Sequence, residues 1–157
     1  MRVRFSMNAY SVIAIAAAMA FTTLHADAPA TPADVLKARH DHYHALGDAN
    51  KVIRDQARAS KPDFAALEKA AAHIQKASIN QQQWFPKGSG PEAGKTRALP
   101  EIWTKPAEFA AAMKMFEERA PKLVTAVQSK DVKAINAAFR EVGGSCKNCH
   151  DNFRAPE

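Results

Sequence analysis

Four stretches of the chain carry apolar residues at the three- and four-residue spacing of amphipathic helices, and this spacing restricts the fold more than any other feature. It predicts helices over about 32–60 and 63–82, one after Thr104, and one from Asp131 towards the C-terminus. The inner positions are Val35, Arg39, Tyr43, Leu46, Asn50 and Ile53; Phe64, Leu67, Ala71, Ile74 and Ser78; Phe109, Met113, Phe116, Ala120, Leu123 and Val127; and Val132, Ile135, Phe139 and Val142. No stretch shows strand-like alternation. The sequence predicts an all-α fold, an antiparallel four-helix bundle.

Short connections join the first helix to the second and the third to the fourth, which favours antiparallel neighbours. Between them, residues 84–103 contain several prolines and glycines and are predicted to form a long loop. Aromatic residues lie at both ends of this loop, Trp84 and Phe85 at one and Trp103 at the other. We expect them to anchor the loop ends in the core.

The only two cysteines lie near the C-terminus, in Cys146-Lys147-Asn148-Cys149-His150. This spacing is typical of covalent haem c attachment. On a helix the two thiols and the imidazole share one face, because positions i, i+3 and i+4 are neighbours. Cys146 and Cys149 would form thioethers to one haem per chain, and His150 would bind the iron.

Three other interpretations of the two cysteines exist. A zinc site needs further ligands, and the chain has no third cysteine. A redox dithiol normally follows a strand, and none is predicted. A structural disulfide between Cys146 and Cys149, in a bundle without haem, is a further alternative.

The N-terminus is typical of a secretory signal peptide, with Arg2 and Arg4 followed by a short apolar run and small residues up to Ala26. We expect a signal peptide over 1–26, a mature domain over 27–157 and export to the periplasm. An uncleaved membrane anchor is the alternative. The formal charge of +6 falls to about +4 without the signal, and the charges are interspersed. This distribution argues against nucleic-acid or membrane binding and is compatible with an acidic redox partner.

The chain resembles the cytochrome c-prime family, whose members are four-helix bundles with haem attached near the C-terminus. The resemblance rests on blocks in the same order along the mature chain. These are Val35-Leu36-Lys37-Ala38-Arg39 with Leu46-Gly47, Phe85-Pro86, Glu101-Ile102-Trp103 with Phe109, and Val142 to Arg154.

The resemblance implies roles for the matching positions. Cys146 and Cys149 would hold the haem, and His150 would be the proximal iron ligand. Arg39 would lie by a haem propionate, and Arg154 would flank the proximal imidazole. Family members also bind NO and CO, and often pair through their first two helices, so a homodimer is a further expectation.

The other side of the iron decides the function. In low-spin family members a methionine of the first helix binds there, whereas this chain has Tyr43 at the matching place. A neutral phenol is a poor ligand, which predicts five-coordinate, high-spin iron in a protein that binds NO or CO, carries electrons, or both, and is not an enzyme. The departure from the family pattern is His40, His42 and His44. They leave open a low-spin, six-coordinate electron carrier with one of them as sixth ligand.

Overall fold

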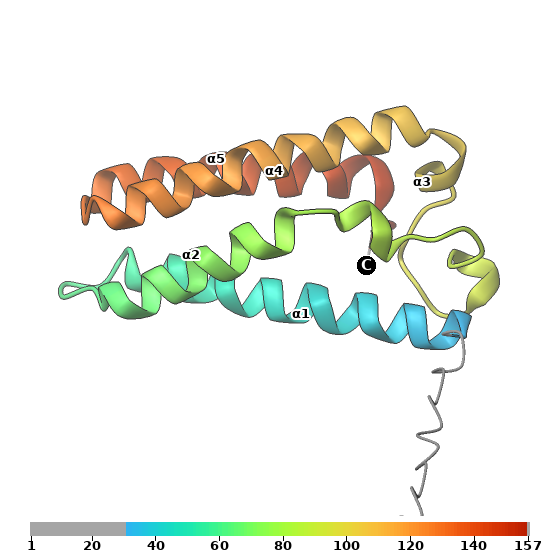
Figure 1. The fold of residues 1–157 in the computed structure, drawn as a ribbon, viewed down its shortest axis with the longest axis horizontal. Coiled ribbons are helices and arrows are strands. Elements are labelled where there is room, and N and C mark those ends of the chain that lie inside the picture. Colours follow the sequence, from blue (N-terminus) through green and yellow to red (C-terminus); the bar gives the residue numbers. More distant parts are fainter. Residues whose placement is uncertain (1–30, 157) are drawn as a thin grey trace, which may run out of the picture.

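The computed structural model describes residues 31–156. Four long helices run antiparallel along one another (Figure 1), and the sequence prediction of an all-α four-helix bundle is confirmed. The elements are α1 (Pro32–Gln56), α2 (Phe64–Ser78), the 3₁₀ turns η1 (Gln81–Trp84) and η2 (Pro91–Ala93), α3 (Glu101–Thr104), α4 (Pro106–Gln128) and α5 (Val132–Phe153). The principal helix packings are α4 with α5, α1 with α2, and α2 with α4.

Short polar side chains fix where three of the helices begin. At α1 the Thr31 hydroxyl accepts a hydrogen bond from the Asp34 amide at 3.2 Å, and the Asp34 carboxylate accepts one from the Thr31 amide at 2.9 Å. This reciprocal capping box satisfies amides that have no partner within the helix. The carboxylates of Asp63 and Asp131 cap α2 and α5 by accepting hydrogen bonds from the amides of Ala66 and Lys133.

Two helix ends differ from the sequence prediction. The first helix ends at Gln56 rather than near Ser60, since the Arg58 and Ala59 amides bond to the carbonyls three residues earlier, and the Gln56 side chain accepts a hydrogen bond from the Asp63 amide at 2.9 Å. The second ends at Ser78 rather than near Gln82. Asn80 takes a left-handed conformation with φ of 56°, which breaks the helical path before η1 begins.

The interior has two adjoining parts. The first, here called the aliphatic cluster, has as its buried members Leu46, Ala49, Ile53, Ala57, Leu67, Ala70, Ala71, Ile74, Phe116, Ala120, Leu123, Val127, Ile135 and Val142. The second, the aromatic cluster, is built on Ile102, Phe109, Ala112, Met113 and Phe153, with Phe85, Ala98, Trp103 and Cys149 packed against it.

The segment between α2 and α4 lies at the end of the bundle opposite the two short connections, beside the first turns of α1 (Figure 1). Its ends are anchored in the core as expected, since Ile102 is buried and the Trp103 indole donates to the carbonyls of Phe85 and Pro86, each at 3.1 Å. It also pairs with the tail that follows α5, where Ala98 and Arg154 form an isolated antiparallel bridge. The loop therefore holds the C-terminal end of α5 in place.

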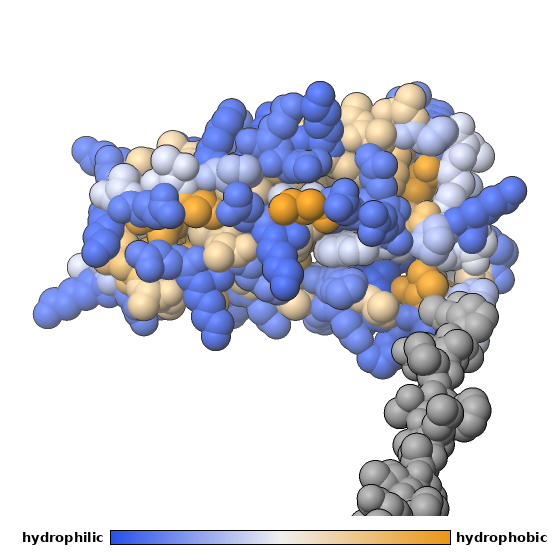
Figure 2. Space-filling model, viewed as in Figure 1, coloured by the Kyte–Doolittle hydropathy of each residue, from blue (hydrophilic) through white to orange (hydrophobic). Residues whose placement is uncertain are grey.

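Hydrophilic side chains are spread over the face in Figure 2, interrupted by small apolar areas. Among the large hydrophobic residues that the structure describes, Ile79 alone is exposed, at 49%. None of the helices within residues 31–156 combines the length and apolar character needed to cross a bilayer. The predicted signal peptide, residues 1–26, lies outside the described residues.

Candidate functional site

The cysteine and histidine side chains of α5 meet on one face, as the spacing predicted. The helix is continuous from Val132 to Phe153, so Cys146, Cys149 and His150 follow one another along it. Both cysteines are free thiols and partly buried. Cys146 packs against the aliphatic cluster and Cys149 against the aromatic cluster. The thiols thus lie where the two parts of the interior meet, and the disulfide alternative finds no support.

Burial favours the uncharged forms of the side chains on this face of α5. It raises the pKa of both thiols, that of Cys149 to about 11, with the neighbouring Cys146 adding to the effect. Burial also lowers the pKa of His150, and the positive charges of Arg154 and Arg97 lower it further. A neutral imidazole is the form that binds a metal ion, and a thioether carries no charge. The surroundings therefore suit both covalent attachment and iron ligation.

Tyr43 of α1 lies across the bundle from these thiols. Its ring packs edge-on against Trp84, with centroids 5.2 Å apart, and lies 6.2 Å from the ring of Phe85. Burial first, and then the nearby Cys149 and Cys146, raise the pKa of the Tyr43 phenol. The side chain is therefore neutral and faces the attachment site, as its inner position on α1 predicted.

Arg39, one turn before Tyr43, is buried at 5% exposure. Its terminal nitrogens donate to the Trp84 carbonyl, the Ser89 hydroxyl and carbonyl, and the Thr96 hydroxyl, at 2.8–3.3 Å. The guanidinium also lies 4.6 Å from the centroid of the Phe85 ring. Within residues 31–156 no ion pair to a carboxylate is found for it. All these acceptors are neutral, so a buried positive charge lacks an anion of its own.

Arg154 ends α5, one turn beyond His150, and is exposed. Its charge acts on the imidazole. Arg97 acts on the same imidazole from the loop, and its side chain donates to the Ala155 carbonyl at 2.7 and 2.9 Å. The imidazole is therefore close to two positive charges, of which the family resemblance implied only that of Arg154.

The three histidines of α1 lie on its outer sides and are exposed. His40 and His44 lie against each other, with ring centroids 4.3 Å apart, and His42 stacks on Trp84 at 4.7 Å. None takes the inner position that Tyr43 occupies. In this arrangement the phenol, and not an imidazole, faces α5.

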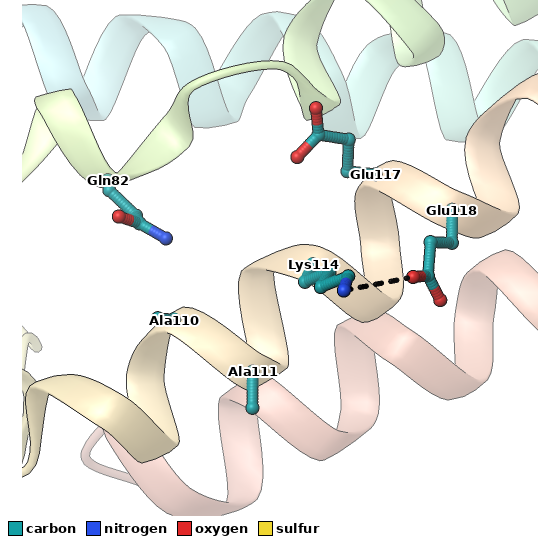
Figure 3. A pocket seen from close by; sticks show the side chains of 6 residues that line it. All are labelled: Gln82, Ala110, Ala111, Lys114, Glu117 and Glu118. Carbon is teal, nitrogen blue, oxygen red and sulfur yellow. Dashed lines mark ion pairs between the residues drawn. The ribbon is translucent and has the colours of Figure 1, made fainter.

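A separate hollow lies away from these residues. It has a volume of about 540 Å³ and opens on the outside of α4 (Figure 3), between Gln82 and the side chains of Lys114, Glu117 and Glu118. Lys114 forms an ion pair with Glu118 at 3.8 Å. None of the predicted site residues lines this hollow, so it is not part of the candidate site.

The residues present fit a covalently held haem. Two partly buried thiols and a neutral imidazole share one helix face, and the rings of Phe85, Phe109 and Phe153 pack edge-on in series beside it, with successive centroids 5.1 and 5.2 Å apart. The unpaired charge of Arg39 suits a carboxylate such as a haem propionate. Iron would be held by His150, and the haem by Cys146 and Cys149.

Sequence reasoning missed the partners of the predicted residues. Ser89 and Thr96, which bind the Arg39 side chain, lie in a loop without periodicity, and Arg97 gave no signal there. The edge-on contact of Trp84 with Tyr43 was also not predicted. These residues are recognisable only once the loop is folded over α1.

Comparisons with known proteins agree with this geometry. The family model described as Cytochrome C' matches residues 34–154. Cytochrome c' from Alcaligenes xylosoxydans xylosoxydans is 34% identical over 129 residues, covering 80% of this chain and 96% of that protein.

Two solved structures of variants of cytochrome c prime from Alcaligenes xylosoxidans are similar. One has carbon monoxide bound, with 27% identity, a TM-score of 0.72 and coverage of 81% of this chain and 98% of that one. The other is ferrous with NO bound, with 27% identity, a TM-score of 0.71 and coverage of 82% and 98%. The family match spans most of the sequence, including the cysteine motif, and the chain therefore belongs to the cytochrome c' family.

Proposed function

We propose that His150 is the single protein ligand of the iron, which is five-coordinate and high-spin, and that the protein binds NO and CO without catalysing a reaction. As a cytochrome c' the chain carries covalent haem c, and the two cysteines fit that attachment. The observation that carries this proposal is the placement of Tyr43. A neutral phenol, and no stronger donor from α1, faces the haem-attachment side of α5.

The other donors of α1 support the same proposal. The sequence of α1 contains no methionine, and its three histidines lie on outer sides of the helix. For His40 or His44 to reach the inner face, α1 would have to turn about its axis and remove Leu46 and Ile53 from the core. The six-coordinate carrier with a histidine ligand is therefore the less favoured alternative.

Haem iron supplies an open coordination position and a one-electron couple. The chain determines what reaches that position. The Tyr43 ring, supported by Trp84 and Phe85, occupies the space that a larger or charged donor would need. His150 stays neutral between Arg154 and Arg97 and is available to iron. Small uncharged diatomic molecules are the ligands that such a site admits most readily.

Optical spectra of the ferrous holoprotein, alone and with NO or CO, test this proposal. We expect a high-spin spectrum without ligand and new bands with each gas. A low-spin spectrum in both oxidation states would contradict it. His40→Ala, His42→Ala and His44→Ala should leave the spin state unchanged, whereas a change in one of them would identify a histidine ligand.

We also propose export to the periplasm by cleavage of residues 1–26, which leaves residues 27–157 as the bundle domain. The same proposal includes a homodimer and an acidic redox partner, on the strength of the family resemblance and the mild positive charge. Mass spectrometry of protein from the periplasmic fraction gives the cleavage site. Sedimentation at several concentrations gives the oligomeric state.

A further inference from the structure

The outer surface of α1 carries a pair of histidines that the haem site does not use. His40 and His44 are one helical turn apart and both are exposed. Their ring centroids are 4.3 Å apart and the ring planes are inclined at 54°. Two imidazoles at positions i and i+4 of a helix form a recurring pair of metal ligands, because both project from the same side.

The ring separation favours one coordination geometry. An imidazole nitrogen binds a metal at about 2.0–2.1 Å, which places the ring centroid about 3.2 Å from the ion. Two such rings are about 4.5 Å apart at a right angle and about 5.2 Å apart at the tetrahedral angle. The observed 4.3 Å matches the right angle. Adjacent ligands at right angles are typical of Cu²⁺ and Ni²⁺, whereas Zn²⁺ prefers a tetrahedron.

A negative charge beside the two histidines also favours a bound cation. The Asp41 carboxylate accepts a hydrogen bond from Lys37. This hydrogen bond, then the Lys37 charge and the charges of His40 and His44, lower the pKa of Asp41. The carboxylate is therefore ionised and close to both rings. No group of three or more metal-binding side chains is found within residues 31–156, so solvent would complete the coordination.

We propose that His40 and His44 form a surface site for one Cu²⁺ ion per chain, with Ni²⁺ as a weaker occupant. The site is separate from the haem, because it lies on the outer side of the helix turns whose inner side carries Arg39 and Tyr43. Cu²⁺ binds nitrogen ligands more tightly than the other divalent ions of its row, which makes it the preferred occupant.

Calorimetric titration of the oxidised holoprotein with Cu²⁺, without an affinity tag, tests the proposal. We expect one ion per chain and a copper EPR spectrum with coupling to two equivalent nitrogens. His40→Ala and His44→Ala should each weaken binding at least tenfold, because losing an outer-shell partner alone costs about 10–100-fold. Both residues are exposed, so circular dichroism should show that each variant is folded.

His42→Ala and His73→Ala are the matched controls. His42 is on the same helix but stacks on Trp84, and His73 is an exposed histidine of α2. Both should bind Cu²⁺ as the unchanged protein does. The proposal is wrong if copper binds equally well to His40→Ala and His44→Ala, if either control loses the site, or if EPR shows one nitrogen ligand.

Discussion

The two parts of the interior are built differently. The aliphatic cluster is closed by the chain itself, since Ile53, Leu67, Leu123 and Ile135 are buried at 0% exposure. The aromatic cluster contains rings in edge-on contact and borders the partly buried Cys149 and the buried Arg39. The side chains of the aliphatic cluster fill the space between the helices by themselves. The aromatic cluster instead contains groups that suit a flat, iron-containing and partly anionic ligand.

This difference separates stability from function along the length of the bundle. The end with the short connections holds the four helices together. The other end, where α1 begins and α5 finishes (Figure 1), positions the haem-binding residues. Changes in the aliphatic cluster should therefore alter unfolding more than spectra, and changes in the site should do the reverse.

The largest effect is expected from replacing both cysteines. Cys146→Ala combined with Cys149→Ala removes both thioether bonds, so no haem should remain attached after denaturation. Mass spectrometry of the denatured protein measures this directly. Lys147→Ala, an exposed change inside the motif, should keep the haem. Hydrogen exchange should show the aliphatic cluster still protected in the double variant; general loss of protection would mean that the two regions fold only together.

Leu123→Ala should destabilise the fold by about 2–5 kcal/mol, because it leaves a cavity among fully buried side chains. Denaturant unfolding measures this, and the haem spectrum should not change. Ile79→Ala, at the exposed Ile79, is the control and should cost far less. A spectral change in Leu123→Ala without loss of stability would contradict the separation of the two regions.

Arg39→Met should cost about 1–3 kcal/mol, since it leaves acceptors in the loop without their donor. The loop amides should then exchange faster, which mass spectrometry of exchanged peptides can measure. Arg54→Met replaces an exposed arginine of the same helix and should cost less than about 1 kcal/mol. Equal costs for the two variants would show that the buried hydrogen bonds of Arg39 contribute nothing net.

The smallest expected effect concerns pH. The pKa of Tyr43 is raised, mainly by burial, so the phenol stays neutral as the pH passes its ordinary value of about 10. Tyr43→Phe should then give the same spectral titration as the unchanged protein from about pH 5 to about pH 10. An alkaline transition that disappears in Tyr43→Phe would show that a phenolate binds the iron.

The sequence predicted what depends on local spacing. The four apolar stripes and the shared face of Cys146 and His150 both follow from helix geometry. The structure added what depends on the fold of the long loop. The contacts of Arg39 with Ser89 and Thr96, and the approach of Arg97 to His150, join residues far apart in sequence at places without periodicity. The early end of α2 depended on the extended backbone of Ile79 and the left-handed backbone of Asn80, which propensity alone did not indicate.

The spin state of the iron tests the central claim most directly. It can be measured by EPR of the ferric holoprotein at neutral pH, beside the variant Tyr43→Met. With a neutral phenol facing the haem, the unchanged protein should give a high-spin signal, and a methionine at the same place should convert it to low spin. A low-spin signal from the unchanged protein would show that another residue binds the iron and would contradict the role assigned to Tyr43.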